Sequence, residues 1–137
     1  MCAFVCNLFD VVMLIYIYVS SISPHLTPLA VPSAPPSEVR GEALDSRSIE
    51  ISWDPPPSAA QNGQISGYKL LYSDHTDNLG PEEATVVTVS TDMRSHIIRD
   101  LEKWTPYKIW LSAFTQVGDG PRSDVIVVKT DEDGMYY

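Results

Sequence analysis

The sequence predicts an all-β domain that folds as a seven-stranded sandwich of two packed antiparallel sheets. From residue 48 onward apolar and polar residues alternate, and a period of two is typical of strands that bury one face. No stretch between residues 36 and 130 shows the period of an amphipathic helix. Proline clusters and glycine-containing turns separate the strands. The 137 residues leave room for one such domain.

The second strand of the sandwich is predicted over residues 48–54, and the third over residues 68–73. In the second strand the residues expected to point inward are Ile49, Ile51 and Trp53. The run Pro55-Pro56-Pro57 then ends this strand. Asn62-Gly63 supplies a turn that tolerates positive φ. In the third strand the alternation points Tyr68, Leu70 and Tyr72 one way and Lys69, Leu71 and Ser73 the other.

The remaining strands are predicted over residues 85–90, 96–101, 107–114 and 125–129. In the strand that begins at Tyr107, the inward residues are Tyr107, Ile109, Leu111 and Ala113, and the outward residues are Lys108, Trp110, Ser112 and Phe114. Gly118-Asp119-Gly120 is expected to form the hairpin turn. In the last strand Ile126 and Val128 point inward, and Val125, Val127 and Lys129 point outward.

Three sequence features together resemble a fibronectin type III domain, an immunoglobulin-like sandwich. They are the strand tryptophan in Ser48-Ile-Glu-Ile-Ser-Trp-Asp-Pro-Pro, the leucine and tyrosine of Leu101-Glu-Lys-Trp-Thr-Pro-Tyr, and the turn Gly118-Asp-Gly-Pro-Arg-Ser. The resemblance covers about residues 32 to 130. The domain is accordingly assigned to residues 32–131, between a leader and linker over residues 1–31 and a tail over residues 132–137. The resemblance implies a structural core that contains Trp53, Tyr68, Leu101 and Tyr107, with Tyr107 in a tyrosine corner.

The two edges of the domain are similar to joints between repeats of neuronal adhesion receptors. These edges are Val31-Pro-Ser-Ala-Pro-Pro-Ser-Glu-Val39 and Thr130-Asp-Glu-Asp133. Together with the stretch 113–123, they resemble repeats of the Down syndrome cell adhesion molecule family, of sidekick proteins and of receptor tyrosine phosphatases of the LAR type. This resemblance predicts that the chain is one repeat of such a receptor, or a fragment of it.

The first 31 residues contain one charged side chain, Asp10, and an apolar run from Val11 to Val19. That run is about half the length that a membrane-spanning helix needs. Three alternatives stay open: a cleaved signal peptide, which no Lys or Arg precedes; a signal anchor over residues 4–23; and a leader with no structural role. From Pro24 to Pro36, five prolines in thirteen residues favour a stiff linker.

Charge and cysteine content exclude several classes of function. The formal net charge is -9, and every basic residue lies at or after Arg40, so nucleic acid is not an expected partner. Cys2 and Cys6 both precede the sandwich, so its sheets must pack without a disulfide, unlike antibody domains. His25, His75 and His96 are far apart in the sequence, with His96 tending inward. No catalytic motif, cofactor or metal site is expected.

The outward residues Leu71, Trp110, Phe114 and Val127 form the candidate protein-binding site. In the family's strand order the third, sixth and seventh strands are neighbours, so these four residues should share one solvent-exposed face, rimmed by Lys69, Lys108 and Lys129. Aromatic anchors of this kind are common at protein interfaces. The alternative is that the lysine stems cover the rings and the face binds nothing. Trp104 is expected to pack on its own turn.

Three hypotheses for function follow. The first is a non-enzymatic extracellular recognition module of cell-adhesion type, which binds a protein partner or a second copy of itself. The second is a structural spacer repeat. The third is an intracellular scaffold domain, which the absence of disulfides permits. A membrane would be involved only through the leader or through a parent receptor.

Overall fold

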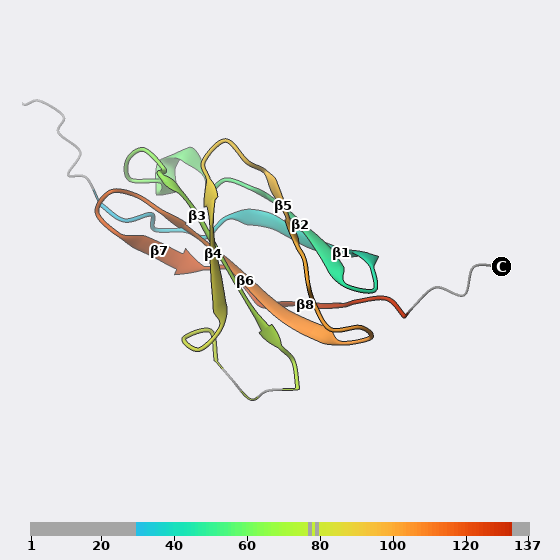
Figure 1. Ribbon diagram of the computed structural model, residues 1–137. Coiled ribbons are helices and arrows are strands. Elements are labelled where there is room, and N and C mark those ends of the chain that lie inside the picture. The colour runs from blue at the N-terminus through green and yellow to red at the C-terminus, as the bar shows by residue number, and fades with distance from the viewer. Residues whose placement is uncertain (1–29, 77, 79, 133–137) are drawn as a thin grey trace, which may run out of the picture.

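The computed structural model describes residues 30–76, 78 and 80–132, and these form a sandwich of two antiparallel sheets (Figure 1). One sheet has the order β1 (Ser37–Asp45), β2 (Ser48–Asp54), β5 (Ser95–Ile98). The other has the order β4 (Thr85–Ser90), β3 (Gly67–Asp74), β6 (Pro106–Phe114), and β6 also pairs with both β7 (Asp119–Arg122) and β8 (Ile126–Lys129). A short 3-10 turn, η1 (Ser58–Ala60), follows β2. The predicted all-β sandwich is confirmed.

The seventh strand, predicted over residues 125–129, is β8, and β7 is an additional strand that the prediction missed. Ser123 lies between the two strands. The Leu111 N–H donates to Ser123 Oγ at 3.0 Å, and the Ser123 N–H donates to the Leu111 carbonyl at 2.7 Å. The Ser123 hydroxyl therefore takes the place of a backbone carbonyl as the acceptor for one N–H of β6. Upstream, Asp119 pairs with Phe114, so the expected turn at Gly118-Asp119-Gly120 is partly wrong. The turn covers residues 115–118, and Asp119 already belongs to β7.

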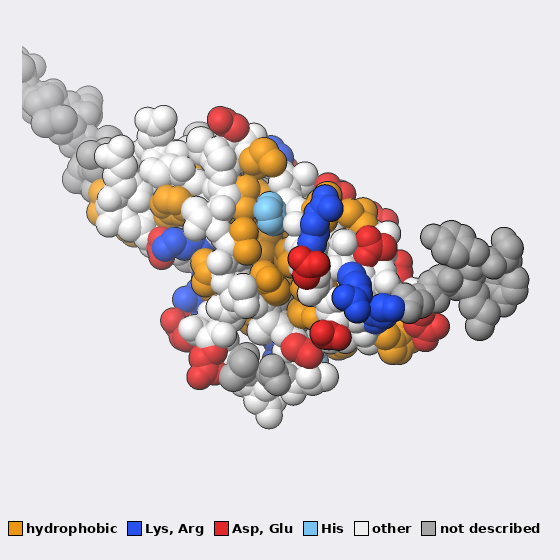
Figure 2. All heavy atoms as spheres, in the orientation of Figure 1, with side chains coloured by type: hydrophobic (Ala, Val, Ile, Leu, Met, Phe, Trp, Pro, Cys, Tyr) orange, Lys and Arg blue, Asp and Glu red, His pale blue; other side chains and the backbone are white. Residues whose placement is uncertain are grey.

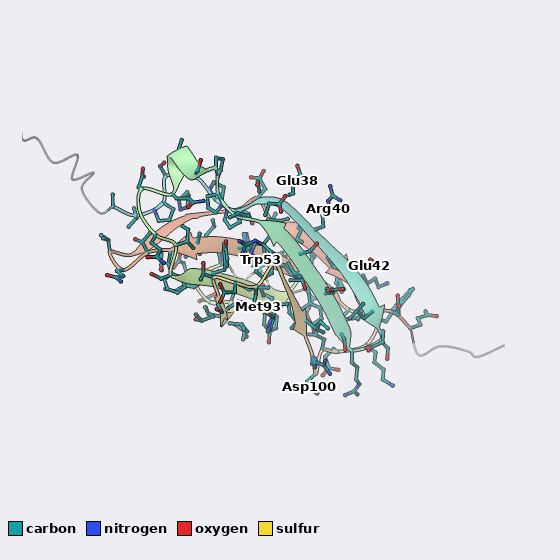
Figure 3. The ribbon with its side chains drawn as sticks, turned by 90° about the horizontal axis from the view of Figure 1, so that it is seen from above. Glu38, Arg40, Glu42, Trp53, Met93 and Asp100 are labelled. Carbon is teal, nitrogen blue, oxygen red and sulfur yellow. The ribbon has the colours of Figure 1, made fainter. Side chains whose placement is uncertain are left out.

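The core lies between the sheets and contains the residues that the alternation points inward. Its fully buried members include Ile49, Ile51, Tyr68, Leu70, Ile109 and Leu111. Trp53 (labelled in Figure 3) is 2% exposed. It contacts Tyr68 edge to face, with ring centroids 5.4 Å apart. Burial raises the pKa of Tyr68 above its ordinary value. Period-two patterning alone selected these side chains, because one face of every strand must avoid water.

Tyr107 anchors the corner between β5 and β6. Its hydroxyl accepts a hydrogen bond from the Glu102 N–H at 2.9 Å, and its ring lies edge to face against Tyr72 at 6.3 Å. Leu101 is also buried in the core. Thr130 is buried as well, and its hydroxyl donates to the Glu102 carbonyl at 2.8 Å. The end of β8 is thereby tied to the same corner.

Ala30, the first described residue, already contacts the sandwich. The Ala30 N–H donates to the Asn62 carbonyl at 3.2 Å, and Thr115 Oγ1 donates to the Ala30 carbonyl at 3.2 Å. Asn62 Nδ2 donates to the Val31 carbonyl at 3.0 Å. Pro32 is fully buried. The last two residues of the sequence-assigned leader thus contact the domain; the rest of the leader, residues 1–29, and residues 133–137 lie outside the described residues.

Candidate functional site

The candidate site lies on the outer face, which we define as the side of the β4-β3-β6-β7/β8 sheet that points away from the other sheet. Strand register determines which side chains share this face. Leu71 of β3 lies opposite Trp110 of β6. Gly67 lies opposite Phe114, and Lys108 lies opposite Val127 of β8. The structure therefore brings all four of the sequence-predicted face residues onto one side of one sheet.

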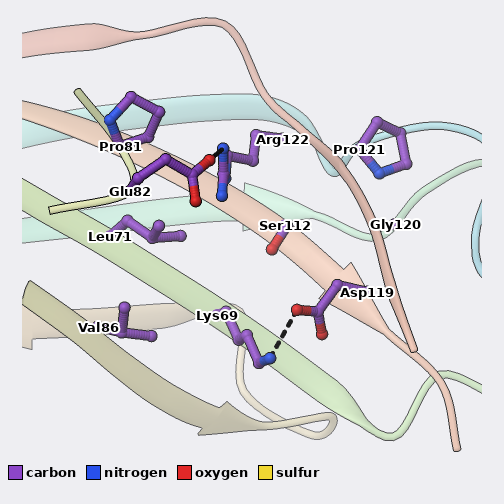
Figure 4. A pocket seen from close by; sticks show the side chains of 10 residues that line it. All are labelled: Lys69, Leu71, Pro81, Glu82, Val86, Ser112, Asp119, Gly120, Pro121 and Arg122. Carbon is purple, nitrogen blue, oxygen red and sulfur yellow. Dashed lines mark hydrogen bonds and ion pairs between the residues drawn. The ribbon is translucent and has the colours of Figure 1, made fainter. Parts of the chain in front are cut away.

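These four residues differ in exposure, and one expectation about them is wrong. Val127 is 52% exposed, whereas Trp110 and Phe114 are half-buried. Leu71, expected to face solvent, is 5% exposed. It lies on the central strand β3 between Trp110 and Val86, and Pro81 and Glu82 of the β3–β4 loop line the same depression above the sheet (Figure 4). Neighbouring strands and this loop bury it on the outer side.

Two ion pairs cross the depression over the outer face. Lys69 Nζ lies 2.7 Å from Asp119 Oδ2, and Arg122 Nη1 lies 2.7 Å from Glu82 Oε1 (Figure 4). The bond from Arg122 lowers the pKa of Glu82 below its ordinary value. These pairs connect β3 and the β3–β4 loop to β7. Each partner keeps substantial solvent exposure, so the pairs order the surface more than they stabilise the fold.

Two lysines lie over aromatic rings at the borders of the outer face. Lys69 Nζ is 5.6 Å from the centroid of the Phe114 ring, and Lys129 Nζ is 3.2 Å from the centroid of the Trp104 ring. Both distances suit a cation–π contact. Trp104 is 55% exposed, and its ring contact is with a lysine of β8, a partner that the sequence analysis did not anticipate. Trp110 itself is half-buried on β6.

Other candidate chemistry can be stated only for the residues that the structure describes. Among them no group of three or more His, Cys, Asp or Glu side chains is placed to hold a metal ion. Within the same ranges no helix has the length and apolar character to cross a membrane. His96 is half-buried and lies opposite Ile51. The surface that remains can offer apolar, cation–π and ion-pair contacts to a partner.

Sequence reasoning missed several residues of this surface. Val86 is 52% exposed and lies opposite Leu71 on β4. The alternation in 85–90 could have placed it on the face, once β4 was recognised as the neighbour of β3. The sequence does not indicate the roles of Glu82, Asp119 and Arg122, because their ion pairs form only when β7 folds against the β3–β4 loop and against Lys69 of β3.

Comparisons with known proteins agree with the fold. The family profile described as "Fibronectin type III domain" matches residues 34–129. The chain is 41% identical over 110 residues to "Tyrosine-protein phosphatase Lar" of Drosophila melanogaster, covering 80% of this chain and 5% of that protein. It is 38% identical over 103 residues to "Cell adhesion molecule Dscam2" of the same organism, covering 75% and 5%. It is 40% identical over 105 residues to "Protein sidekick-1" of Gallus gallus, covering 76% and 5%.

A solved structure gives the same result. The FN5 domain of Drosophila Lar superposes with a TM-score of 0.59 at 34% identity, covering 74% of this chain and 98% of that domain. The chain spans about 5% of the length of the three curated relatives named above, so the match concerns a domain and not those whole proteins. The resemblance inferred from Trp53, Tyr107 and the β6–β7 turn is confirmed, and the chain belongs to the fibronectin type III domain family.

Proposed function

We propose that this domain is a non-catalytic, extracellular protein-recognition module of cell-adhesion type, and that it binds its partner through the outer face. One observation carries the proposal. The half-buried Trp110 lies in a row of apolar side chains that crosses the sheet from Val86 through Leu71 and ends near Val127. Binding energy at protein interfaces concentrates on such tryptophans when apolar and cationic side chains surround them.

The relatives and the placement of the chain ends support this proposal. One relative is named as a cell adhesion molecule. The first and last described residues lie at opposite ends of the sandwich (Figure 1), which is the arrangement required for repeats joined end to end. A domain held in that way leaves its sheet faces free for lateral contact. An extracellular location would agree with these relatives.

A structural spacer is the second candidate, and specific contacts favour it. Lys69 lies over the Phe114 ring, Lys129 lies over the Trp104 ring, and Leu71 is already buried by its own chain. In each contact the domain packs its own side chains on apolar surface, so no second protein is needed there. The two candidates therefore differ in one respect, which is whether the exposed part of Trp110 gains free energy from a second protein.

Substitution of Trp110 tests the proposal. Trp110→Ser should weaken capture by a panel of purified receptor ectodomains by about 30-fold, since loss of a central tryptophan often costs about 2 kcal/mol of binding free energy. Leu44→Ser is the matched control, because Leu44 is 48% exposed and lies on β1 of the other sheet. It should leave capture unchanged. If wild type and both variants bind every ectodomain equally, or none, the spacer hypothesis replaces the proposal.

Location has its own test. The full chain expressed in animal cells should appear in the culture medium or on the cell surface. Retention of all of it in the cytosol would contradict the extracellular part of the proposal, while leaving the outer face open to an intracellular partner.

A further inference from the structure

The free edges of the two sheets are protected to very different degrees. An edge strand presents unpaired N–H and C=O groups that can pair with another strand, and proteins usually block this with charges, proline, bulges or short strands. Among the described strands the edges are β1 and β5 in one sheet, and β4 and the β7/β8 side in the other. Three of these four edges carry such protection.

The protected edges use different devices. β1 carries Glu38, Arg40 and Glu42 (Figure 3), and its pairing with β2 is irregular at two places. β5 has only 4 residues and includes His96. β7 and β8 have 4 residues each, and Pro121 lies within β7. A strand added to one of these edges would meet charged side chains, a proline that lacks an N–H donor, or a strand too short to form many hydrogen bonds.

β4 has none of these features. Its 6 residues, Thr-Val-Val-Thr-Val-Ser, include no charged side chain, proline or glycine. All 6 pair with β3 in unbroken register, from Thr85 opposite Tyr72 to Ser90 opposite Gly67. Within the described chain its other side has no strand partner. In Figure 2 the surface that β4 occupies in Figure 1 is white and orange, and red and blue side chains lie to either side.

We propose that the free edge of β4 pairs with β4 of a second copy of this chain. The two strands would run antiparallel about a two-fold axis and would join the two β4-containing sheets into one continuous sheet. This contact uses the sheet edge and not the outer face, so it is separate from the recognition role proposed above. It gives the domain a means of self-association.

Strand geometry makes a second copy a suitable occupant. A two-fold axis perpendicular to the sheet keeps each side chain on its own face, so residues that pair must have the same parity. With Val87 on the axis, Val86 lies opposite Thr88 of the other copy, and Thr85 lies opposite Val89. Every pair then joins β-branched side chains, which pack well across strands. No like charges meet, although each chain carries a net charge of -9.

The charge of the chain predicts how salt acts on this contact. Two chains with a net charge of -9 each repel, and added salt screens that repulsion. The β4 pairing itself contains no ion pair that salt could weaken. Self-association should therefore become stronger as salt rises, whereas an interface formed by Lys69 and Arg122 would become weaker.

Two valine variants test the proposal by sedimentation equilibrium of the full chain, with reductant present to keep Cys2 and Cys6 unpaired. Wild type should show a molar mass that rises from 15.2 kDa toward about twice that value with concentration, as expected for an isologous pair. Val86→Lys should weaken association by about tenfold, because two lysines would meet diagonally across the axis. Val127→Lys is the matched control: both valines are 52% exposed on the outer face, but Val127 lies on β8.

Hydrogen exchange locates the contact. Amides of Thr85–Ser90 should gain protection as wild-type concentration rises, and Val86→Lys should abolish the gain. Trp110→Ser should leave the dimer intact, which separates this proposal from the function of the outer face. Three results would overturn it: a wild-type chain that stays monomeric; an equal loss of association with Val86→Lys and Val127→Lys; or protection that rises only outside β4.

Discussion

The core between the sheets and the outer face are built from the same strands but by different kinds of contact. In the core, side chains such as Ile51 and Leu111 are fully buried by close packing alone. On the outer face, order depends on polar contacts between distant residues: Lys69 and Asp119 are 50 positions apart, and Glu82 and Arg122 are 40 apart. This difference shows that the alternation of apolar and polar residues within each strand specifies the core. The contacts of the outer face form only when distant parts of the chain have folded together.

The largest expected effect comes from one substitution made in both regions. Trp53→Ala should lower the free energy of unfolding by about 3 to 5 kcal/mol, because it leaves a large cavity between the sheets. Trp110→Ala should cost less than half of that amount, since its ring is half-buried and solvent can fill the space. Urea denaturation followed by circular dichroism measures both. Equal costs would show that the outer face is part of the core.

The prediction of the core from the sequence needed no knowledge of which strand lies beside which. An inward valine or isoleucine is apolar whatever its neighbour, so the alternation in residues 48–54, 68–73 and 107–114 was sufficient. The additional strand β7 was not predictable in this way, because its four residues, Asp119–Arg122, include Gly120 and Pro121 and show no alternation. Alternation identifies strands that bury one face, and a short strand without it is missed.

The four predicted residues do share the outer face, but Val86 was missed and the exposure of Leu71 was predicted incorrectly. Parity and the family strand order placed Leu71, Trp110, Phe114 and Val127 together. The burial of Leu71 was not predicted, because alternation does not show how the neighbouring strands and the β3–β4 loop surround a residue of the outer face. Whether these residues bind a partner stays a prediction, and Trp110→Ser tests it.

A methyl group added to the core should have a smaller but still distinct effect. A Cβ on Gly41 would lie 2.5 Å from Val128 Cγ2 and 3.0 Å from Ile51 Cδ1. Gly41→Ala should therefore destabilise the domain by about 1 to 3 kcal/mol through overpacking. Gly80→Ala is the control, because no heavy atom lies within 4 Å of its added carbon. Thermal melts that shift equally for the two variants would contradict the close packing at β1.

Shortening the leader tests where the packed region begins. A chain that starts at Ala30 should melt like the full chain, if residues 1–29 make no stabilising contact. A chain that starts at Pro32 should lose about 1 to 2 kcal/mol, because the hydrogen bonds to the Ala30 and Val31 carbonyls disappear. Calorimetry distinguishes the two. A lower melting temperature for the chain that starts at Ala30 would mean that the leader packs on the sandwich.

The smallest effect is expected at Glu82, where only the outer face should respond. The hydrogen bond from Arg122 holds the pKa of Glu82 below its ordinary value of 4.5. Because the folded-state pKa is the lower one, the contribution of the pair is fully present above pH 4.5. It is lost as the pH falls through the folded-state pKa. The Glu82 side chain is 77% exposed, so global unfolding should hardly change.

The readout for Glu82 must therefore be local. Methyl resonances of Leu71, which lies in the same depression as Glu82, should shift when wild type is acidified below pH 4.5, as the β3–β4 loop loosens. Glu82→Gln should show the shifted resonances already at neutral pH and should lack the titration. Glu83→Gln, one residue along the loop, should titrate like wild type. If Glu82→Gln keeps the wild-type acid response, the Glu82–Arg122 pair does not hold the loop over Leu71, and strand packing accounts for the burial of this leucine. The outer face would then resemble the core more closely than its ion pairs suggest.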